Sequence, residues 1–258
     1  MKAMIFAAGL GTRLKPLTDT MPKALVPVCG QPLLYHVITK LVAAGYDRLV
    51  VNVHHFPDQI IDYLKAHDFG VRIDISDERD FLRETGGGIK YAAPLLIASS
   101  TPPSAPLRMT EEPFLVHNVD IISNLDLKWL RELHRPEALA TLVVRERKTQ
   151  RYLLFDDDGR LKGWTNIATG EVRSPFPDID PDRCRKLAFA GIHLMSPAIF
   201  EAFDKLGFGD RFSIMDFYLQ ICAAYPIYAA VPEGFTMVDV GKKETLSEAE
   251  RVCSAILQ

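Results

Sequence analysis

The fold is decided by the opening of the chain, which runs Met4-Ile5-Phe6-Ala7-Ala8-Gly9-Leu10-Gly11-Thr12-Arg13-Leu14-Lys15-Pro16-Leu17-Thr18 and continues as Met21-Pro22-Lys23-Ala24-Leu25. Residues 3–8 are an apolar run of strand length, and the run stops at Gly9. A loop with two glycines, an Arg, two prolines and a Lys follows. In α/β sheets, ligands bind where the chain leaves the carboxyl end of a strand. This stretch therefore predicts a buried first strand followed by a ligand-binding loop.

The composition of the loop indicates phosphate as the ligand. Gly9 and Gly11 lack a Cβ, so backbone N–H groups there can approach an anion closely. Arg13 and Lys23 add two cations, and the prolines stiffen the loop, which lowers the entropy lost on binding. The alternative is an ordinary strand-to-helix turn with surface cations. The G-x-G-x-x-G fingerprint of dinucleotide sites is excluded because its third position is Leu14, and no Walker A loop is present.

This stretch also resembles the signature G-x-G-T-R-x-x-P-L-T-x-x-x-P-K-x-L of the sugar-nucleotide pyrophosphorylases, a nucleotidyltransferase family. The resemblance implies a three-layer α/β sandwich, Rossmann-like, with a mostly parallel sheet. It implies a nucleoside triphosphate and a sugar 1-phosphate as substrates, with Mg²⁺ as cofactor. The nucleotide-binding residues that it implies in this loop are Ala8, Gly9, Gly11, Thr12 and Arg13.

Length and composition agree with one nucleotidyltransferase domain over residues 1–258, monomeric or in a small homo-oligomer. The net charge of −3 gives no footprint for nucleic acid or an anionic membrane. Four scattered cysteines without a C-x-x-C pair favour reduced thiols in a cytoplasmic protein and argue against zinc. No apolar stretch reaches membrane-spanning length. No hexapeptide repeats are visible, so we expect no C-terminal β-helix domain.

Strand and helix patterns alternate along the chain. Strands are predicted over residues 3–8, 49–53, 71–75, 114–120, 138–144, 187–195 and 227–231, and helices over 32–44, 57–67, 125–134, 197–203, 213–224 and 243–257. This alternation predicts a parallel sheet. Residues 151–164 resemble a hairpin, 99–113 a surface loop, and 165–186 a long irregular insertion that could act as a lid or specificity element.

Three consecutive glycines, in Glu84-Thr85-Gly86-Gly87-Gly88, precede a further predicted helical stretch that runs to Leu96. Glycines at a helix start let a flat ligand lie against the backbone, although a flexible turn would have the same composition. In the family, the corresponding loop lies against the nucleotide base. The resemblance therefore suggests Glu84, Gly86 and Gly87 as base-side residues.

Two acids are candidate ligands of Mg²⁺, which prefers hard oxygen donors. Asp120 ends a buried strand, where it could otherwise be a helix cap or a turn residue. Asp239 lies in Val238-Asp239-Val240-Gly241, which resembles the W-x-D-x-G of the family, whose Asp is the second metal carboxylate. Two departures from the family are Val119 in place of a Gly and Val238 in place of an aromatic residue.

The sugar side is predicted at Asn118 and Gly191. Gly191 interrupts an apolar strand, and a glycine there often marks close approach of a ligand. The resemblance assigns this F-x-G-I segment to the sugar.

The implied reaction is direct nucleotidyl transfer, in which an already ionised phosphate attacks the α-phosphorus without a general base. Arg13 would stabilise pyrophosphate, and Lys23 would bridge the reacting phosphates. The pattern is closest to N-acetylmuramate 1-phosphate uridylyltransferases. Three alternatives stay open: mannose or heptose 1-phosphate guanylyltransferases, cytidylyl transfer to a phosphorylated alcohol, and a non-catalytic sugar-nucleotide sensor. Glu84 does not decide between uridylyl and guanylyl transfer, because it could accept a hydrogen bond from either uracil or guanine.

Overall fold

The structure is a computed structural model that describes residues 1–97 and 112–257. The surface loop predicted over residues 99–113 lies almost entirely outside these residues.

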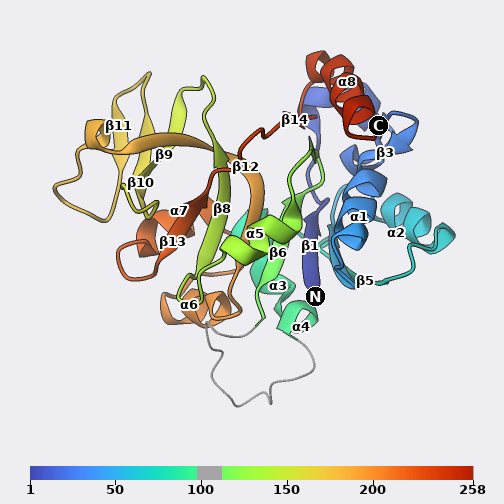
Figure 1. Cartoon of the computed structure of the whole chain (residues 1–258). Coiled ribbons are helices and arrows are strands. Elements are labelled where there is room, and N and C mark those ends of the chain that lie inside the picture. The colour runs from blue at the N-terminus through green and yellow to red at the C-terminus, as the bar shows by residue number, and fades with distance from the viewer. Residues whose placement is uncertain (98–111, 258) are drawn as a thin grey trace.

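A ten-stranded mixed sheet forms the middle of the molecule (Figure 1). Its strands are β1 (Lys2–Phe6), β4 (Arg48–Val53), β5 (Arg72–Asp77), β6 (Phe114–Asn118), β8 (Ala140–Arg145), β9 (Arg151–Phe155), β10 (Leu161–Asn166), β11 (Glu171–Arg173), β12 (Arg185–Met195) and β13 (Ile227–Ala230). The strands β5, β4, β1 and β6 are parallel neighbours in that order. The other half of the sheet is built around β12, which runs antiparallel to β6, β8 and β9.

Helices cover both faces of this sheet. They are α1 (Leu33–Ala43), α2 (Pro57–Ala66), α3 (Glu84–Tyr91), α4 (Ala93–Ile97), α5 (Leu127–Leu133), α6 (Ile199–Lys205), α7 (Ile214–Ile221) and α8 (Leu246–Leu257). Two two-stranded ribbons complete the structure, namely β2 (Pro27–Val28) with β3 (Gln31–Pro32) and β7 (Ile121–Ser123) with β14 (Met237–Asp239). Within the described ranges, no helix is long and apolar enough to cross a membrane.

The alternating side chains of the central strands create two separate apolar cores. Ala3 and Ile5 of β1 belong to the core that contains the buried face of α1. Met4 lies between them in sequence but packs in the other core, with residues of α3, α6 and α7. Because successive strand residues point to opposite faces, the two cores lie on the two sides of one sheet. The predicted three-layer, Rossmann-like α/β fold is confirmed.

The pairing of β1 with β6 positions the site. Phe6 lies beside Asn118 in the parallel register, so both strands end at the same edge of the sheet. The loop after β1 and the turn after β6 therefore leave the sheet side by side.

Two predictions of local structure are wrong. The strand predicted to end at Asp120 ends at Asn118, and Asp120 lies in the turn that leads into β7. The insertion predicted to be irregular over residues 165–186 contains the end of β10 and all of β11, which pair as a hairpin. In that hairpin, Val172 is 40% exposed and alternates with polar neighbours, so its sequence lacks the apolar signal of a buried strand.

Candidate active site

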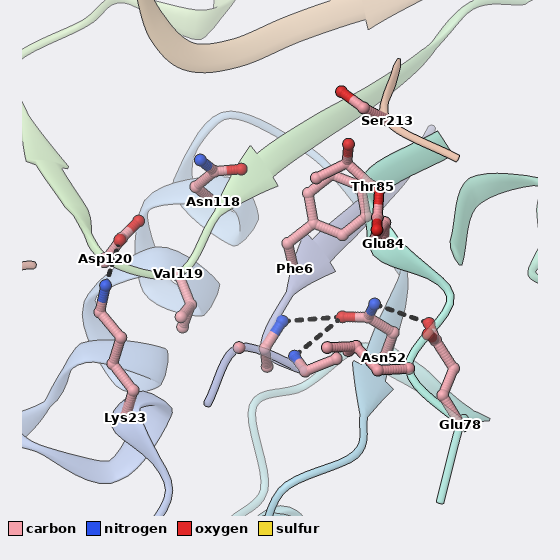
Figure 2. Close-up of a pocket in the computed structure, with 14 residues that line it drawn as sticks. Phe6, Lys23, Asn52, Glu78, Glu84, Thr85, Asn118, Val119, Asp120 and Ser213 are labelled. Carbon is pink, nitrogen blue, oxygen red and sulfur yellow. Dashed lines mark hydrogen bonds and ion pairs between the residues drawn. The ribbon is translucent and has the colours of Figure 1, made fainter. Parts of the chain in front are cut away.

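A cavity of about 440 Å³ lies at the shared carboxyl edge of β1 and β6 (Figure 2). Its walls come from the loop after β1, the ends of β4 and β6, and the segment that leads into α3. The lining residues are Phe6, Ala7, Ala8, Gly9, Lys23, Asn52, Glu78, Leu82, Glu84, Thr85, Asn118, Val119, Asp120 and Ser213. Lys23 and Asp120 lie at one end of this cavity, and Asn52 and Glu78 lie at the other.

The loop after β1 is shaped by contacts of its own. It contains three short 3₁₀ turns, at Thr12–Leu14, Leu17–Asp19 and Lys23–Leu25. Gly11 has a φ of +63°, and the Thr18 hydroxyl donates a hydrogen bond of 2.8 Å to its carbonyl. A Cβ at Gly11 would lie 2.8 Å from the Thr18 methyl carbon, so only glycine fits there. Thr12 and Arg13 are exposed on this loop.

Asn52 fixes the start of the loop. Its side-chain oxygen accepts hydrogen bonds from the backbone N–H groups of Ala7, at 2.8 Å, and Ala8, at 3.3 Å. Its amide nitrogen donates to Glu78 Oε1 at 2.8 Å. Glu78 is fully buried, and burial raises the pKa of its carboxyl against the opposing hydrogen bond from Asn52. The floor of the cavity at this end is thus a buried polar network that contacts the residues directly after β1.

Lys23 and Asp120 form an ion pair across the other end of the cavity, and their side chains are only 11% and 17% exposed. Asp239 is held next to Asp120 by the β7–β14 ribbon. In that ribbon Asp239 pairs with Ile121, and the Val240 N–H donates to the Asp120 carbonyl at 2.8 Å. Burial, and then the charge of Asp120, raise the pKa of the Asp239 carboxyl, while the charges of Lys23, Arg13 and Arg147 oppose this rise.

Asp239 also has an unsatisfied atom that bears on metal binding. Its Oδ1 is buried without a hydrogen-bond partner in the described residues. A buried carboxylate oxygen of this kind, beside a second carboxylate, is suited to a divalent cation. Two protein carboxylates fit Mg²⁺ in particular, because Mg²⁺ usually completes its shell with waters and substrate phosphates.

Arg13 lies near Asp239, beside Gly241. A Cβ at position 241 would lie 2.7 Å from Asp239 Oδ1 and 2.9 Å from Arg13 Nη2. The Arg13 guanidinium and the Asp239 carboxylate therefore both border Gly241. The arrangement gathers two cations and two carboxylates around the loop after β1, which suits phosphoryl or nucleotidyl transfer.

A family profile described as "Nucleotidyl transferase" matches residues 2–160. The chain belongs to the nucleotidyl transferase family. It is 34% identical over 255 residues to the N-acetylmuramate alpha-1-phosphate uridylyltransferase of Caulobacter vibrioides, covering 96% of this chain and 95% of that protein. It is 29% identical over 251 residues to mannose-1-phosphate guanylyltransferase 1 of Arabidopsis thaliana, covering 94% of this chain but 62% of that protein. The sequence is thus that of a sugar-1-phosphate nucleotidyltransferase.

Solved structures agree with the fold of this nucleotidyltransferase. HddC from Yersinia pseudotuberculosis complexed with GMP-PN has a TM-score of 0.70 at 23% identity, over 97% of this chain and 98% of that chain. UDP-glucose pyrophosphorylase complexed with UDP-glucose has a TM-score of 0.73 at 19% identity, over 98% of both chains.

Gly86 and Gly87 lie within α3 and outside the cavity lining. Their N–H groups donate to the Phe212 carbonyl at 2.9 and 3.2 Å. A Cβ would lie 2.2 Å from the Phe212 ring at position 86 and 2.2 Å from the Asp210 carbonyl oxygen at position 87. These glycines allow the start of α3 to pack against the segment before α7. Their assignment to the base side stays a prediction.

Glu84 does line the cavity of the nucleotidyltransferase. It has a φ of +62°, which is rare for a residue with a side chain, and its Oε1 accepts a hydrogen bond of 3.0 Å from Arg211 Nε. Its carboxylate is therefore already paired with a cation at the cavity rim.

On the predicted sugar side, only Asn118 reaches the cavity. Gly191 lies behind it, with a φ of +76°, and a Cβ there would lie 2.8 Å from the Asn118 amide nitrogen. β12 also shifts register against β8 between Phe189 and His193. The glycine therefore makes room for Asn118 at a distortion in the strand, and the close approach is made by a side chain of the same protein.

Sequence reasoning missed several lining residues. Asn52 could have been noticed, because it is a lone polar residue in the apolar run 49–53. Glu78, Thr85 and Ser213 carry no such signal, since each lies in a segment rich in polar residues.

The packing of Gly87 gives a stability prediction. Gly87→Ala should lower the free energy of unfolding by about 1–3 kcal/mol, because the new methyl group would overlap the Asp210 carbonyl. Gly209→Ala is the matched control, since a Cβ at Gly209 has nothing within 4 Å, and its effect should stay within about 0.5 kcal/mol. Urea denaturation of the three proteins measures the difference. Equal stability of the two variants would show that α3 does not depend on this contact.

Proposed function

We propose that this nucleotidyltransferase transfers UMP from UTP to N-acetylmuramate 1-phosphate and releases pyrophosphate. The observation that carries the proposal is the meeting of Lys23, Asp120 and Asp239 at the end of the loop after β1. The name of the Caulobacter vibrioides relative, which covers nearly the whole chain, supports the choice of nucleotide and sugar.

The triphosphate lies along the loop after β1. Gly9 lines the cavity, and Ala7 and Ala8 are held by Asn52, so the backbone there is fixed before the nucleotide binds. A fixed backbone loses little entropy on binding. The base occupies the end of the cavity bounded by Glu78, Thr85 and Ser213, which offer acceptors and hydroxyl groups to its polar edge.

Lys23 neutralises the two phosphates that react. The attacking oxygen of a sugar phosphate is ionised at neutral pH, so the enzyme has to bring two anions together rather than remove a proton. Lys23 lies at the same end of the cavity as Asp120 and is largely shielded from solvent. A charge acts strongly in such a position. When the substrates bind, its ammonium exchanges part of its contact with Asp120 for phosphate oxygens. Arg13, beside Asp239, is placed to bind the departing pyrophosphate.

Asp120 and Asp239 would hold Mg²⁺, which supplies charge neutralisation on the phosphate oxygens. The unpartnered Oδ1 of Asp239 supports this assignment. The repulsion between the two carboxylates, which raises the pKa of Asp239, would be relieved by a cation between them.

The function is tested by measuring pyrophosphate release with each of four nucleoside triphosphates against a panel of sugar 1-phosphates. We expect UTP with N-acetylmuramate 1-phosphate to give the highest kcat/KM. A preference for GTP with mannose 1-phosphate would favour guanylyl transfer, which the Arabidopsis thaliana relative is named for. Binding without turnover for every pair would favour a sugar-nucleotide sensor.

The metal assignment predicts the behaviour of two isosteric variants. Asp120→Asn and Asp239→Asn should each lower Mg²⁺-dependent turnover by at least about 100-fold, because a neutral amide cannot replace a carboxylate ligand. Asp157→Asn, in the exposed turn between β9 and β10, is the control and should keep normal turnover. Steady-state rates over a Mg²⁺ titration decide the point. Normal rates in both site variants would remove these residues from the metal site.

Lys23 is predicted to act on the chemical step more than on binding. Lys23→Ala should lower the single-turnover rate at saturating substrates by at least about 100-fold, as expected for loss of a preorganised charge. Lys23→Arg should restore it only in part, because a planar fork does not replace a point charge. Lys128→Ala, exposed on α5, serves as the control. An unchanged single-turnover rate in Lys23→Ala would contradict the mechanism.

A further inference from the structure

The structure contains a second cavity, of about 620 Å³. It is formed by the loop between β8 and β9, by Ile167 after β10, and by the start of β12. β12 runs antiparallel to both β6 and β8, so its first residues extend past the end of β6, with Arg185 seven residues before Ile192, the partner of His117. In Figure 1 the loop after β8 reaches the same upper edge as β14, which carries Asp239.

The lining of this cavity is strongly cationic. It contains Arg147, Lys148, Arg185 and Lys186 against a single acid, Glu146. Lys186 is paired with Asp182 at 2.8 Å. For Arg147, Lys148 and Arg185, no ion pair or hydrogen bond of the side chain is found within residues 1–97 and 112–257.

The cations are crowded. Burial, and then the charge of Arg147, lower the pKa of the neighbouring Arg145. Like charges brought together in this way repel each other, and a bound anion would relieve the repulsion.

The loop that carries two of these cations is held in place. The Tyr152 hydroxyl accepts a hydrogen bond of 3.0 Å from the Thr149 N–H, and the Ile167 N–H donates to the Gln150 carbonyl at 2.8 Å. Tyr152, Ile167 and Leu187 add apolar surface to the cavity wall. A molecule that binds here would therefore meet apolar surface beside a group of exposed cations, which suits a sugar ring that carries an anionic substituent.

We propose that the sugar 1-phosphate accepted by this enzyme carries a carboxylate, and that Arg147, Lys148 and Arg185 bind it. The inference rests on the proposed function, because the 1-phosphate must lie at Lys23 for the rest of the sugar to extend toward this cavity. A neutral hexose would offer only hydroxyl groups and leave the cations unpaired. A carboxylate accepts two parallel hydrogen bonds from a guanidinium. The lactyl acid of N-acetylmuramate has this chemistry.

The test uses two pairs of substrates that differ in one charge. The first pair is N-acetylmuramate 1-phosphate and its lactyl carboxamide, and the second is glucuronate 1-phosphate and glucose 1-phosphate. Wild-type enzyme should favour the acid in kcat/KM by roughly 10- to 100-fold, mainly through KM, as expected for charge-assisted hydrogen bonds. Calorimetry of the same compounds should show the same order of affinity without turnover.

Arg147→Gln and Arg185→Gln should reduce this preference by at least about tenfold, because each variant should raise the KM for the acid more than the KM for its neutral partner. Lys65→Gln, an exposed cation on α2, is the control and should keep the full preference. If both variants instead raise the KM for UTP, or weaken acid and amide equally, the cluster serves the triphosphate and the proposal is overturned.

The remaining outcomes separate this proposal from the proposed function. Equal use of N-acetylmuramate 1-phosphate and its carboxamide would overturn the carboxylate site while leaving uridylyl transfer intact. If N-acetylmuramate 1-phosphate is not a substrate, the proposed sugar is wrong and the glucuronate pair decides: a preference for glucuronate supports the cationic site, and parity or a preference for glucose overturns it. If no sugar phosphate turns over, the affinities measured by calorimetry decide. Tighter binding of the acids than of their neutral partners supports the cationic site, and equal or weaker binding overturns it.

Discussion

The ion pair between Lys23 and Asp120 is the contact on which the site depends. It joins the loop after β1 to the turn after β6, two segments 97 residues apart in sequence. The contact is possible because β1 and β6 are parallel neighbours and end at the same edge of the sheet. A third segment joins them when β14 pairs with β7 and places Asp239 next to Asp120. Charge balance then links all three, since the carboxylates repel each other and Lys23 offsets that repulsion.

The two ends of the cavity are built differently. At the end proposed for the base, Asn52 and Glu78 form a buried network that fixes the backbone of Ala7 and Ala8. At the other end, Lys23 and Asp120 lie beside the position proposed for the reacting phosphates (Figure 2). One end is thus held by hydrogen bonds, whereas next to the other end the Oδ1 of Asp239 has no hydrogen-bond partner among the described residues. This contrast is expected where a protein preorganises a site for charge that arrives with its substrates.

The parts of this account that could be predicted from sequence are those set by local pattern. The apolar run before Gly9 predicted β1, and the alternation of strands and helices predicted the sheet. Asp120 and Asp239 were predicted as a pair, and the β7–β14 ribbon brings them together, although neither of its short strands was predicted. Such three-residue strands are defined by their partner and leave little periodicity to detect.

The glycines of the site show what local pattern leaves open. The sequence predicts Gly86, Gly87 and Gly191 as places where a ligand approaches the backbone. In the structure, Phe212, Asp210 and Asn118 of the same chain make those approaches. A glycine shows that something comes close, but its sequence neighbours do not show whether that is a ligand or another part of the fold. Asn52 and Glu78 were missed because their roles arise only when β4 lies beside β1.

Isotope exchange between labelled pyrophosphate and UTP tests the central claim, that a sugar phosphate attacks the nucleotide directly at Lys23. Direct attack predicts exchange in the presence of the sugar 1-phosphate and Mg²⁺, because the full reaction must run forward and back. It predicts no exchange with enzyme, Mg²⁺ and UTP alone. Exchange without the sugar phosphate would reveal a covalent nucleotidyl-enzyme and contradict the account.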